Sequence, residues 1–229
     1  FGQATQVTSS IFFFVTRLLG SGVRLMAASV AVSILLGVPI VPTIVGFTIV
    51  SIIYIAAGGV SAIVWTNVVQ ALVFIAAGIG ALVFVVSQVD GGPERAISLA
   101  QDAGRLDLFD WGPAPGDADF LKRWLSEPNI FWVAVLNGFV GSLAAFGTDH
   151  DLMQRLLSVE TRRDSQRTLL LSPLITLGVL LVYLSLGSAL FAFYAQHPEL
   201  TVVKPDQVLP EFVAQVMPAG LKGLVLTAI

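Results

Sequence analysis

Residues 137–155 read Asn-Gly-Phe-Val-Gly-Ser-Leu-Ala-Ala-Phe-Gly-Thr-Asp-His-Asp-Leu-Met-Gln-Arg, an apolar segment of membrane-spanning character with glycine interruptions that runs into charged residues. Ionisable groups are costly in lipid and usually face a cavity or a partner. Glycine weakens a helix locally, and irregular backbone at membrane depth persists only where protein or a wet site satisfies it. The combination is typical of a helix that lines a solute pathway.

The composition predicts a polytopic membrane protein. Of the 229 residues, 55% are hydrophobic and 12% are charged, against about 25% charged in soluble domains. The chain has no cysteine, which excludes disulfides, a thiol nucleophile and cysteine metal sites. No His/Glu spacing suggests a metal site, no catalytic triad order is present, and no basic run indicates nucleic acid, so we expect neither an enzyme nor a cofactor.

A helix of about 20 apolar residues can span a bilayer. The chain contains five apolar stretches that could form full spans and a sixth that is cut off at residue 229. Pro39 and Pro42 should stop one helix and start the next, and Gly58-Gly59 should separate the second and third. The predicted spans are Val7–Val38, Pro42–Ala57, Ser61–Val89, Pro128 to about Ser158, Thr168–Ala195, and a start at Gly220.

The charges of the loops predict an orientation. Residues 90–127 carry eight acids and four bases, whereas the short loop after the fourth span carries Arg162, Arg163 and Arg167. The positive-inside rule places the basic loop in the cytoplasm, so 90–127 and 196–219 become outer loops. We expect a short amphipathic helix at Pro93–Ala103, another at 205–217, and an interfacial anchor formed by Leu121, Trp124 and Leu125.

Two arginines are the only charged side chains in the first 89 residues. Arg17 lies about three turns into its span and Arg24 lies seven residues later on the same face. Their partners must be acids elsewhere, backbone carbonyls, water or an anionic solute. We expect Arg24 to face the permeation pathway.

Several motifs together resemble the sodium/solute symporter family. The run Gly58-Gly59 to Trp65-Thr66-Asn67 and Gln70 resembles its Gly-Gly, Trp-Thr-Asp and Gln signature, and Gly147-Thr148-Asp149-His150 with Gln154-Arg155 resembles a second signature. Pro218 to Leu224 resembles the start of a later core helix, and Arg17 also fits. The resemblance covers essentially the whole chain, in order.

The resemblance implies the inverted-repeat fold of the leucine-transporter type, an all-α membrane bundle in which solute binds near the midplane between broken helices. The 229 residues would then be a fragment of a single transporter domain, carrying the third to seventh core helices and the start of the eighth. The family's main sodium site would be incomplete in this fragment, because one of its helices lies upstream.

The same resemblance assigns residues to the ion and solute routes. Asn67 stands on the cation route where many members carry aspartate, and the loss of charge disfavours a second sodium. An amide that caps neighbouring backbone explains Asn67 equally well. Asp149 matches a family Asn/Asp that contacts solute or holds the inner gate, although an ion pair with Arg155 explains it equally well. Ser142, Ala145 and Phe146 fall where sugar carriers place Asn, Tyr and Trp; Ala145 argues against a sugar, and Phe146 could form the gate.

Other polar residues are expected to organise the inner end of the fourth span. Gln154 and Arg155 match the family pattern, which suggests a gating network, although a plain interfacial anchor explains them equally well. Asp151 is placed for a helical ion pair with Arg155. Arg17 completes this predicted inner-end network. His150 replaces the usual glutamine and could couple protons, although a simple hydrogen bond to a neighbour is the commoner role.

The resulting functional prediction is sodium-coupled uptake of a small organic solute by alternating access in a cell membrane, with the bacterial inner membrane as the expected location. Sodium is the expected coupling ion, and the solute, sodium and the bilayer are the expected partners. One alternative is a transporter-like sensor domain fused to a histidine kinase. A second is a proton-coupled symporter that uses Asp149 and His150. A passive channel is disfavoured, because no repeated filter-like sequence appears.

Overall fold

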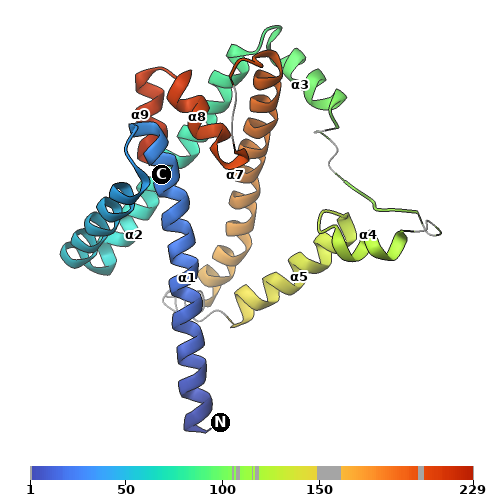
Figure 1. The fold of residues 1–229 in the computed structure, drawn as a ribbon. Coiled ribbons are helices and arrows are strands. Elements are labelled where there is room, and N and C mark those ends of the chain that lie inside the picture. Colours follow the sequence, from blue (N-terminus) through green and yellow to red (C-terminus); the bar gives the residue numbers. More distant parts are fainter. Residues whose placement is uncertain are drawn as a thin grey trace. The chain divides into compact units, whose positions relative to one another are not determined.

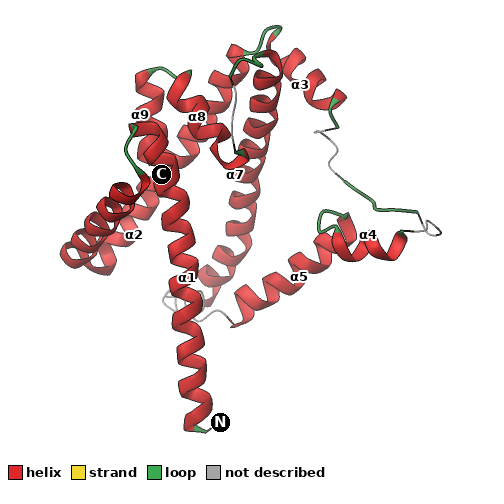
Figure 2. Cartoon of the chain, viewed as in Figure 1, coloured by secondary structure: helices red, strands yellow, loops and turns green. Residues whose placement is uncertain are grey.

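The computed structural model describes residues 2–104, 106, 109–114, 116, 119–148, 161–200 and 204–228, without the side chains of 59–63, 145, 146 and 148. Throughout these residues the regular structure is helical, apart from one isolated bridge between Asp110 and Ile130 (Figures 1 and 2). The elements are α1 (Gln3–Leu36), α2 (Ile40–Gln88), α3 (Gly92–Asp102), α4 (Phe120–Ser126), α5 (Phe131–Thr148), α7 (Arg162–Gln196), η1 (Pro205–Gln207), α8 (Val208–Gln215) and α9 (Ala219–Ala228).

The helices correspond closely to the predicted spans and loop helices. Four apolar stretches are long enough to cross a membrane: Gln3–Leu36, Ile40–Gly58, Val64–Gln88 and Arg162–Gln196. Shorter apolar helices occupy Phe131–Ala144 and Ala219–Ala228. The predicted loop helices at 93–103 and 205–217 are present as α3 and as η1 with α8.

One detail differs from the sequence prediction. Helical backbone continues through Gly58-Gly59 within the single element α2, although the stretches on either side, Ile40–Gly58 and Val64–Gln88, are separate membrane-length spans as predicted. Glycine costs only about 1 kcal/mol in a helix interior relative to alanine, whereas proline costs about 3 kcal/mol and removes a hydrogen bond. A glycine pair therefore weakens a helix at this point without ending it.

The turn between α1 and α2 is built by Ser33, Gly37 and Pro39. Gly37 has a left-handed φ of 66°, and its N–H donates to the carbonyl of Ser33. The Ser33 hydroxyl donates to the carbonyl of Val38 at 2.6 Å. Glycine adopts this backbone conformation without steric cost, which makes it the usual residue just past a helix end. Pro39 then precedes α2 and fixes its first turn.

The first of two compact units contains residues 1–96 and 185–229. Within it α1 packs against α2 and α8, and α2 packs against α9. Small or branched side chains at every fourth position form the buried stripe of α2, as expected for one helical face. This stripe consists of Ala77, Ala81, Val85 and, just past the helix end, Val89.

Gly80 lies where α2 meets α9. A Cβ added there would lie 3.5 Å from Leu221 Cδ2 and 4.0 Å from Leu224 Cδ2. Those distances are ordinary van der Waals contacts, so the position has room for one methyl group and little more.

Replacing Gly80 with leucine is expected to destabilise the protein by about 1–3 kcal/mol, because the added atoms must displace Leu221 and Leu224. Thermal unfolding of the purified intact protein in detergent would measure the change. Gly80→Ala is the matched control and should show no loss, since it adds only the Cβ. Equal stability of the leucine variant would show that this helix contact is loose.

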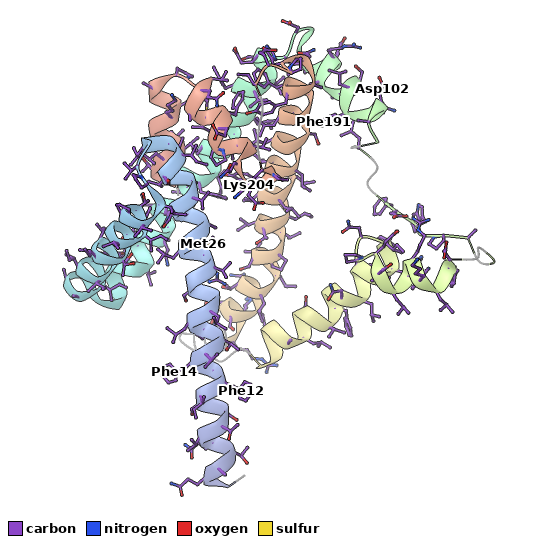
Figure 3. All side chains as sticks on the ribbon, in the orientation of Figure 1. Phe12, Phe14, Met26, Asp102, Phe191 and Lys204 are labelled. Carbon is purple, nitrogen blue, oxygen red and sulfur yellow. The ribbon has the colours of Figure 1, made fainter. Side chains whose placement is uncertain are left out.

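The second unit contains residues 97–184 and is described by itself. It holds α4, α5 and α7 as far as Leu184, and α7 carries Pro173 within the helix. Large apolar side chains cover the exposed surface of α5, among them Val135, Leu136, Phe139 and Leu143. The first half of α1, in the other unit, also exposes apolar side chains, and Figure 3 shows Phe12 and Phe14 projecting from that helix. Such surfaces suit lipid or further helices.

Candidate functional site

Arg17 and Arg24 lie on α1, as predicted. The Arg17 guanidinium carbon lies 5.2 Å from the centroid of the Phe13 ring, one turn earlier, in a cation–π arrangement. Arg17 is half-buried, whereas Arg24 is exposed. Within the described part of the chain, Arg24 has no hydrogen bond or ion pair. Arg24 is therefore a cation in an apolar helix whose charge is free to bind something outside these residues.

The other predicted site residues divide between the two units and the parts outside the description. Asn67 is exposed on α2 in the first unit, and Ser142 is exposed on α5 in the second. Phe146 belongs to α5, although its side chain is outside the described structure. The remaining predicted residues lie outside the described ranges: Asp149, His150, Asp151, Gln154 and Arg155. The inner-end network and the cation route thus stay predictions.

The basic segment at the start of α7 has a defined helix cap. The Asp164 N–H donates to Thr161 Oγ1 at 3.2 Å, and the Thr161 hydroxyl donates to Asp164 Oδ2 at 2.5 Å. Arg167 Nη1 lies 3.7 Å from Asp164 Oδ1. The hydroxyl before the helix accepts from an N–H group that has no partner within the helix. The carboxylate in the first turn interacts favourably with the positive end of the helix dipole. The cap fixes where α7, and its cluster of arginines, begins.

The predicted core-helix start at Pro218 is confirmed by α9, which begins at Ala219. Lys222, inside this motif, donates from Nζ to the carbonyl of Ala214 at 2.5 Å. Ala214 lies in the last turn of α8, where carbonyls lack intrahelical partners and a cation is favoured by the dipole. Lys222 therefore ties the first turn of α9 to the end of α8, a contact that sequence reasoning missed.

Replacing Lys222 with methionine is expected to cost about 1–3 kcal/mol, since the Ala214 carbonyl loses a charged donor in partly buried surroundings. Methionine keeps the length and the apolar stem of the side chain. Unfolding of the intact protein in detergent would report the loss, and Lys222→Arg should restore part of it. A methionine variant as stable as the parent would show that water replaces the lysine.

An aromatic core joins α2, α7 and α8. The Phe212 ring is fully buried, with its centroid 4.9 Å from that of Phe193 and 6.1 Å from that of Phe84. Phe193 also stacks on His197 at 4.3 Å. The helix predicted at 205–217 could have indicated this contact, because Leu209, Phe212, Val213 and Val216 recur at helical spacing.

A side-chain amide links the end of α7 to the turn after α2. The N–H of Asp90 donates to Gln196 Oε1 at 2.9 Å, and Gln196 Nε2 donates to the carbonyl of Asp90 at 3.0 Å. The two hydrogen bonds satisfy both main-chain groups of one turn residue. Together with the Phe212 core and Lys222, this contact makes one end of the first unit a fixed assembly of α2, α7, α8 and α9.

A metal centre of the usual kind is not found in the described residues, which contain no group of three or more His, Asp or Glu side chains suited to one. Among the described candidates, Arg24 offers a guanidinium, Asn67 an amide and Ser142 a hydroxyl, all in exposed side chains. Such groups can bind an anion or a weakly held monovalent cation.

Comparison with known proteins places these features in a family context. A family model for the sodium:solute symporter family matches residues 1–229. The sodium/sialic acid symporter NanT of Aliivibrio fischeri is 28% identical over 183 residues, which cover 78% of this chain and 34% of that protein. The human sodium/iodide cotransporter is 26% identical over 234 residues, covering 99% of this chain and 34% of the relative. The chain thus spans about a third of the length of these relatives.

A solved structure shows the fold. It is a sodium-coupled sialic acid symporter in a substrate-bound, outward-open state, with a TM-score of 0.71 and 24% identity. The match covers 90% of this chain and 42% of that one. The predicted all-α membrane bundle is confirmed by this likeness and by the apolar helices.

Proposed function

Because this chain belongs to the sodium:solute symporter family, we propose that the intact protein takes up a small organic anion across a cell membrane, driven by sodium. The observation that carries the proposal is Arg24, an exposed cation on an apolar helix with no partner among the described residues. The similar proteins support the anion, since they are named for sialic acid, iodide and monocarboxylates. All of these solutes carry negative charge at neutral pH.

Arg24 is proposed to bind the anionic group of the solute. A guanidinium presents several N–H donors in a planar fork that matches a carboxylate, and it stays charged at any physiological pH. In a site with little water, this attraction is stronger than it would be in solution. On the family resemblance, Ser142 and Phe146 of α5 and Asp149 are also proposed as solute-contact or gate residues.

Sodium coupling requires that sodium and solute bind the same conformation more tightly together than apart. Asn67 is proposed to lie on the route of the cation, where its carbonyl oxygen can serve as a neutral ligand. Arg17, Asp151, Gln154 and Arg155 are proposed to hold the inner end closed until both ligands are bound. Transport would then follow alternating access, with sodium leaving to the cytoplasm.

The charge distribution supports a proposed orientation. Arg162, Arg163 and Arg167 would face the cytoplasm, and residues 90–127 and 196–219 would form outer loops. A bacterial inner membrane is the proposed location. The protein would require no cofactor and catalyse no covalent reaction.

Uptake into sealed liposomes containing the intact protein tests the function. Radiolabelled carboxylates, sialic acids, amino acids, sugars and inositols would be offered with an inward sodium gradient, and potassium would replace sodium in the control. We expect sodium-dependent uptake of a carboxylate and none of its amide analogue. Equal uptake of the neutral analogue would contradict the anion, and solute binding without uptake would favour the sensor alternative.

Replacing Asp149 with asparagine distinguishes sodium from proton coupling. Because Asp149 is also proposed to contact the solute or hold the gate, the variant should lose part of its uptake rate. If sodium is the coupling ion, we expect the remaining uptake to depend on sodium, with an unchanged pH profile between about pH 6 and about pH 8. A proton-coupled carrier would instead lose its response to a pH gradient. Initial rates measured under each gradient separately would decide between the two.

A further inference from the structure

Four aromatic rings from the second unit form a continuous surface at the start of α5. The members of this aromatic surface are Phe109, Trp111, Phe131 and Trp132. Trp111 lies 5.1 Å from Phe131 and 6.2 Å from Trp132 between ring centroids. Phe109 stacks on Trp111 at 5.7 Å and meets Phe131 edge-on at 5.3 Å. Centroid distances in this range are those of favourable aromatic pairs.

Main-chain contacts hold the loop rings against the helix. The Phe131 N–H donates to the carbonyl of Asp110 at 2.7 Å, and Asp110 forms the bridge to Ile130. The Gly112 N–H donates to Asp110 Oδ1 at 2.9 Å. Gly112 has a φ of 81°, and a Cβ there would lie 3.0 Å from Cγ2 of the fully buried Ile130. Residues 109–112 are thus fixed to the first turn of α5.

The surface remains open although its members are large and apolar. Trp111 is 61% exposed and Trp132 is 52% exposed. In the same unit α4 exposes Leu121 and Leu125, which are four residues apart and share one helical face. Exposed aromatic and leucine side chains in this number mark a surface that meets something other than water.

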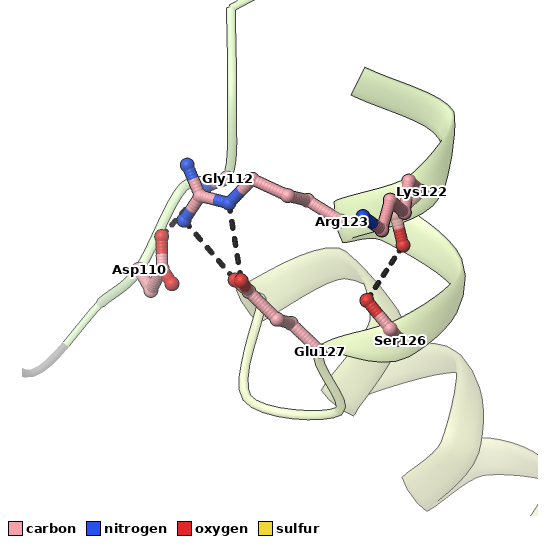
Figure 4. A network of polar contacts seen from close by, with 6 residues as sticks. All are labelled: Asp110, Gly112, Lys122, Arg123, Ser126 and Glu127. Carbon is pink, nitrogen blue, oxygen red and sulfur yellow. Dashed lines mark hydrogen bonds and ion pairs between the residues drawn. The ribbon is translucent and has the colours of Figure 1, made fainter. Parts of the chain in front are cut away.

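Charged side chains also lie on and just after α4. On α4, Arg123 makes two hydrogen bonds of 3.1 Å to Glu127, from Nε and from Nη2. Lys122 lies beside it, and its carbonyl accepts a hydrogen bond from the Ser126 hydroxyl at 2.6 Å (Figure 4). Aromatic rings mixed with basic side chains are the composition that favours the polar boundary of a bilayer, where one end of the surface is apolar and the other wet.

We propose that the aromatic surface and the Leu121–Leu125 face of α4 lie in the headgroup region of the lipid bilayer. Trp132 is the second residue of α5, an apolar helix whose exposed side chains continue through Phe139. The start of such a helix marks the depth at which the hydrocarbon ends. Because Trp111 packs on Trp132 and Phe131, the loop residues are held at that same depth.

The consequence is that residues 109–112 and α4 lie along the membrane surface instead of extending into water. Indole rings at the interface resist movement both into the hydrocarbon and into solution. The aromatic surface therefore sets the depth and tilt of α5, the helix on which Ser142 and Phe146 lie. The inference does not depend on the identity of the solute.

Depth-dependent fluorescence quenching tests the proposal on the intact protein in liposomes. All tryptophans except Trp111 are replaced by phenylalanine, and the lipids carry bromine either near the headgroup or near the chain end. Two controls in a tryptophan-free background bracket the depth. Phe139→Trp lies about 12 Å along α5 from Phe131, at 1.5 Å per residue. Asp102→Trp lies at the exposed end of α3.

We expect shallow bromines to quench Trp111 more than deep ones, as for an interfacial ring, with little quenching by aqueous iodide. Phe139→Trp should be quenched more by deep bromines and Asp102→Trp by iodide alone. Quenching of Trp111 by iodide alone would overturn the proposal, because the surface would then face water. Protection from both quenchers would also overturn it, since another part of the protein or a second copy would then cover the surface.

Discussion

Replacing Arg24 with glutamine is expected to reduce sodium-driven uptake of the carboxylate by about 10- to 100-fold at low solute concentration. A hydrogen bond to a charged group contributes about 1.5–3 kcal/mol, and glutamine keeps a donor while it loses the charge. The loss should appear mainly as a higher KM, because Arg24 is proposed to bind the solute. Arg24→Lys should retain more uptake, since it keeps the charge without the planar fork.

Arg17→Gln is the matched control for this prediction. Its guanidinium is engaged with the Phe13 ring 5.2 Å away and is proposed to act at the inner gate instead of binding solute. Its removal should therefore lower the maximal rate of uptake and leave the KM for solute nearly unchanged. The amount of inserted protein would be measured for every variant, so that a failure to fold is not mistaken for a failure to bind. A normal KM in the Arg24→Gln variant would show that Arg24 does not bind the solute. That result would not bear on whether sodium drives the uptake.

Replacing Phe212 with alanine should lower the stability of the protein by about 3–5 kcal/mol, the usual cost of removing a buried phenylalanine. Phe212 is fully buried between Phe193 and Phe84, so three helices lose their common contact. The purified intact protein should unfold or aggregate at a clearly lower temperature in detergent, and sodium-driven uptake should fall with the folded fraction.

The comparison for this variant is Phe14→Ala on α1. The Phe14 side chain is 66% exposed and projects from the helix, so its removal should leave the unfolding temperature almost unchanged. The two substitutions are chemically identical and differ only in burial. If both variants unfold at the same temperature as the parent, the aromatic core of α2, α7 and α8 contributes little to stability.

The helices could be predicted from the sequence because hydrophobic length and helix-ending residues act locally. Pro39, one of the two prolines predicted to separate the first two spans, lies in a real turn, and Pro218 precedes a real helix start. Gly58-Gly59 was a weaker signal, since glycine lowers helix stability without removing a hydrogen bond. The backbone there stays helical in α2.

The tertiary contacts were much less accessible to sequence reasoning. Trp111 meets Trp132 across a loop, and Lys222 meets a carbonyl of α8; neither pair has a periodic spacing that reveals it. Leu121 and Leu125, in contrast, could be predicted to share one helical face from their spacing along α4 alone, and both are exposed there; their interfacial position stays a prediction. Arg24 was found because a charge in an apolar segment is conspicuous without any structure. The roles of Asp149 and its neighbours rest on the family resemblance.

The amide contact between Gln196 and residue 90 determines which substitutions each position accepts. Both hydrogen bonds use the main chain of residue 90, so its aspartate side chain can be replaced without loss of either bond. Residue 196 needs a donor and an acceptor at glutamine length; glutamate lacks the donor and asparagine is too short. Mutational scanning should therefore find that residue 196 tolerates few substitutions and that residue 90, its partner, tolerates many. A search for paired sequence changes would miss a contact of this kind, even though the two residues touch.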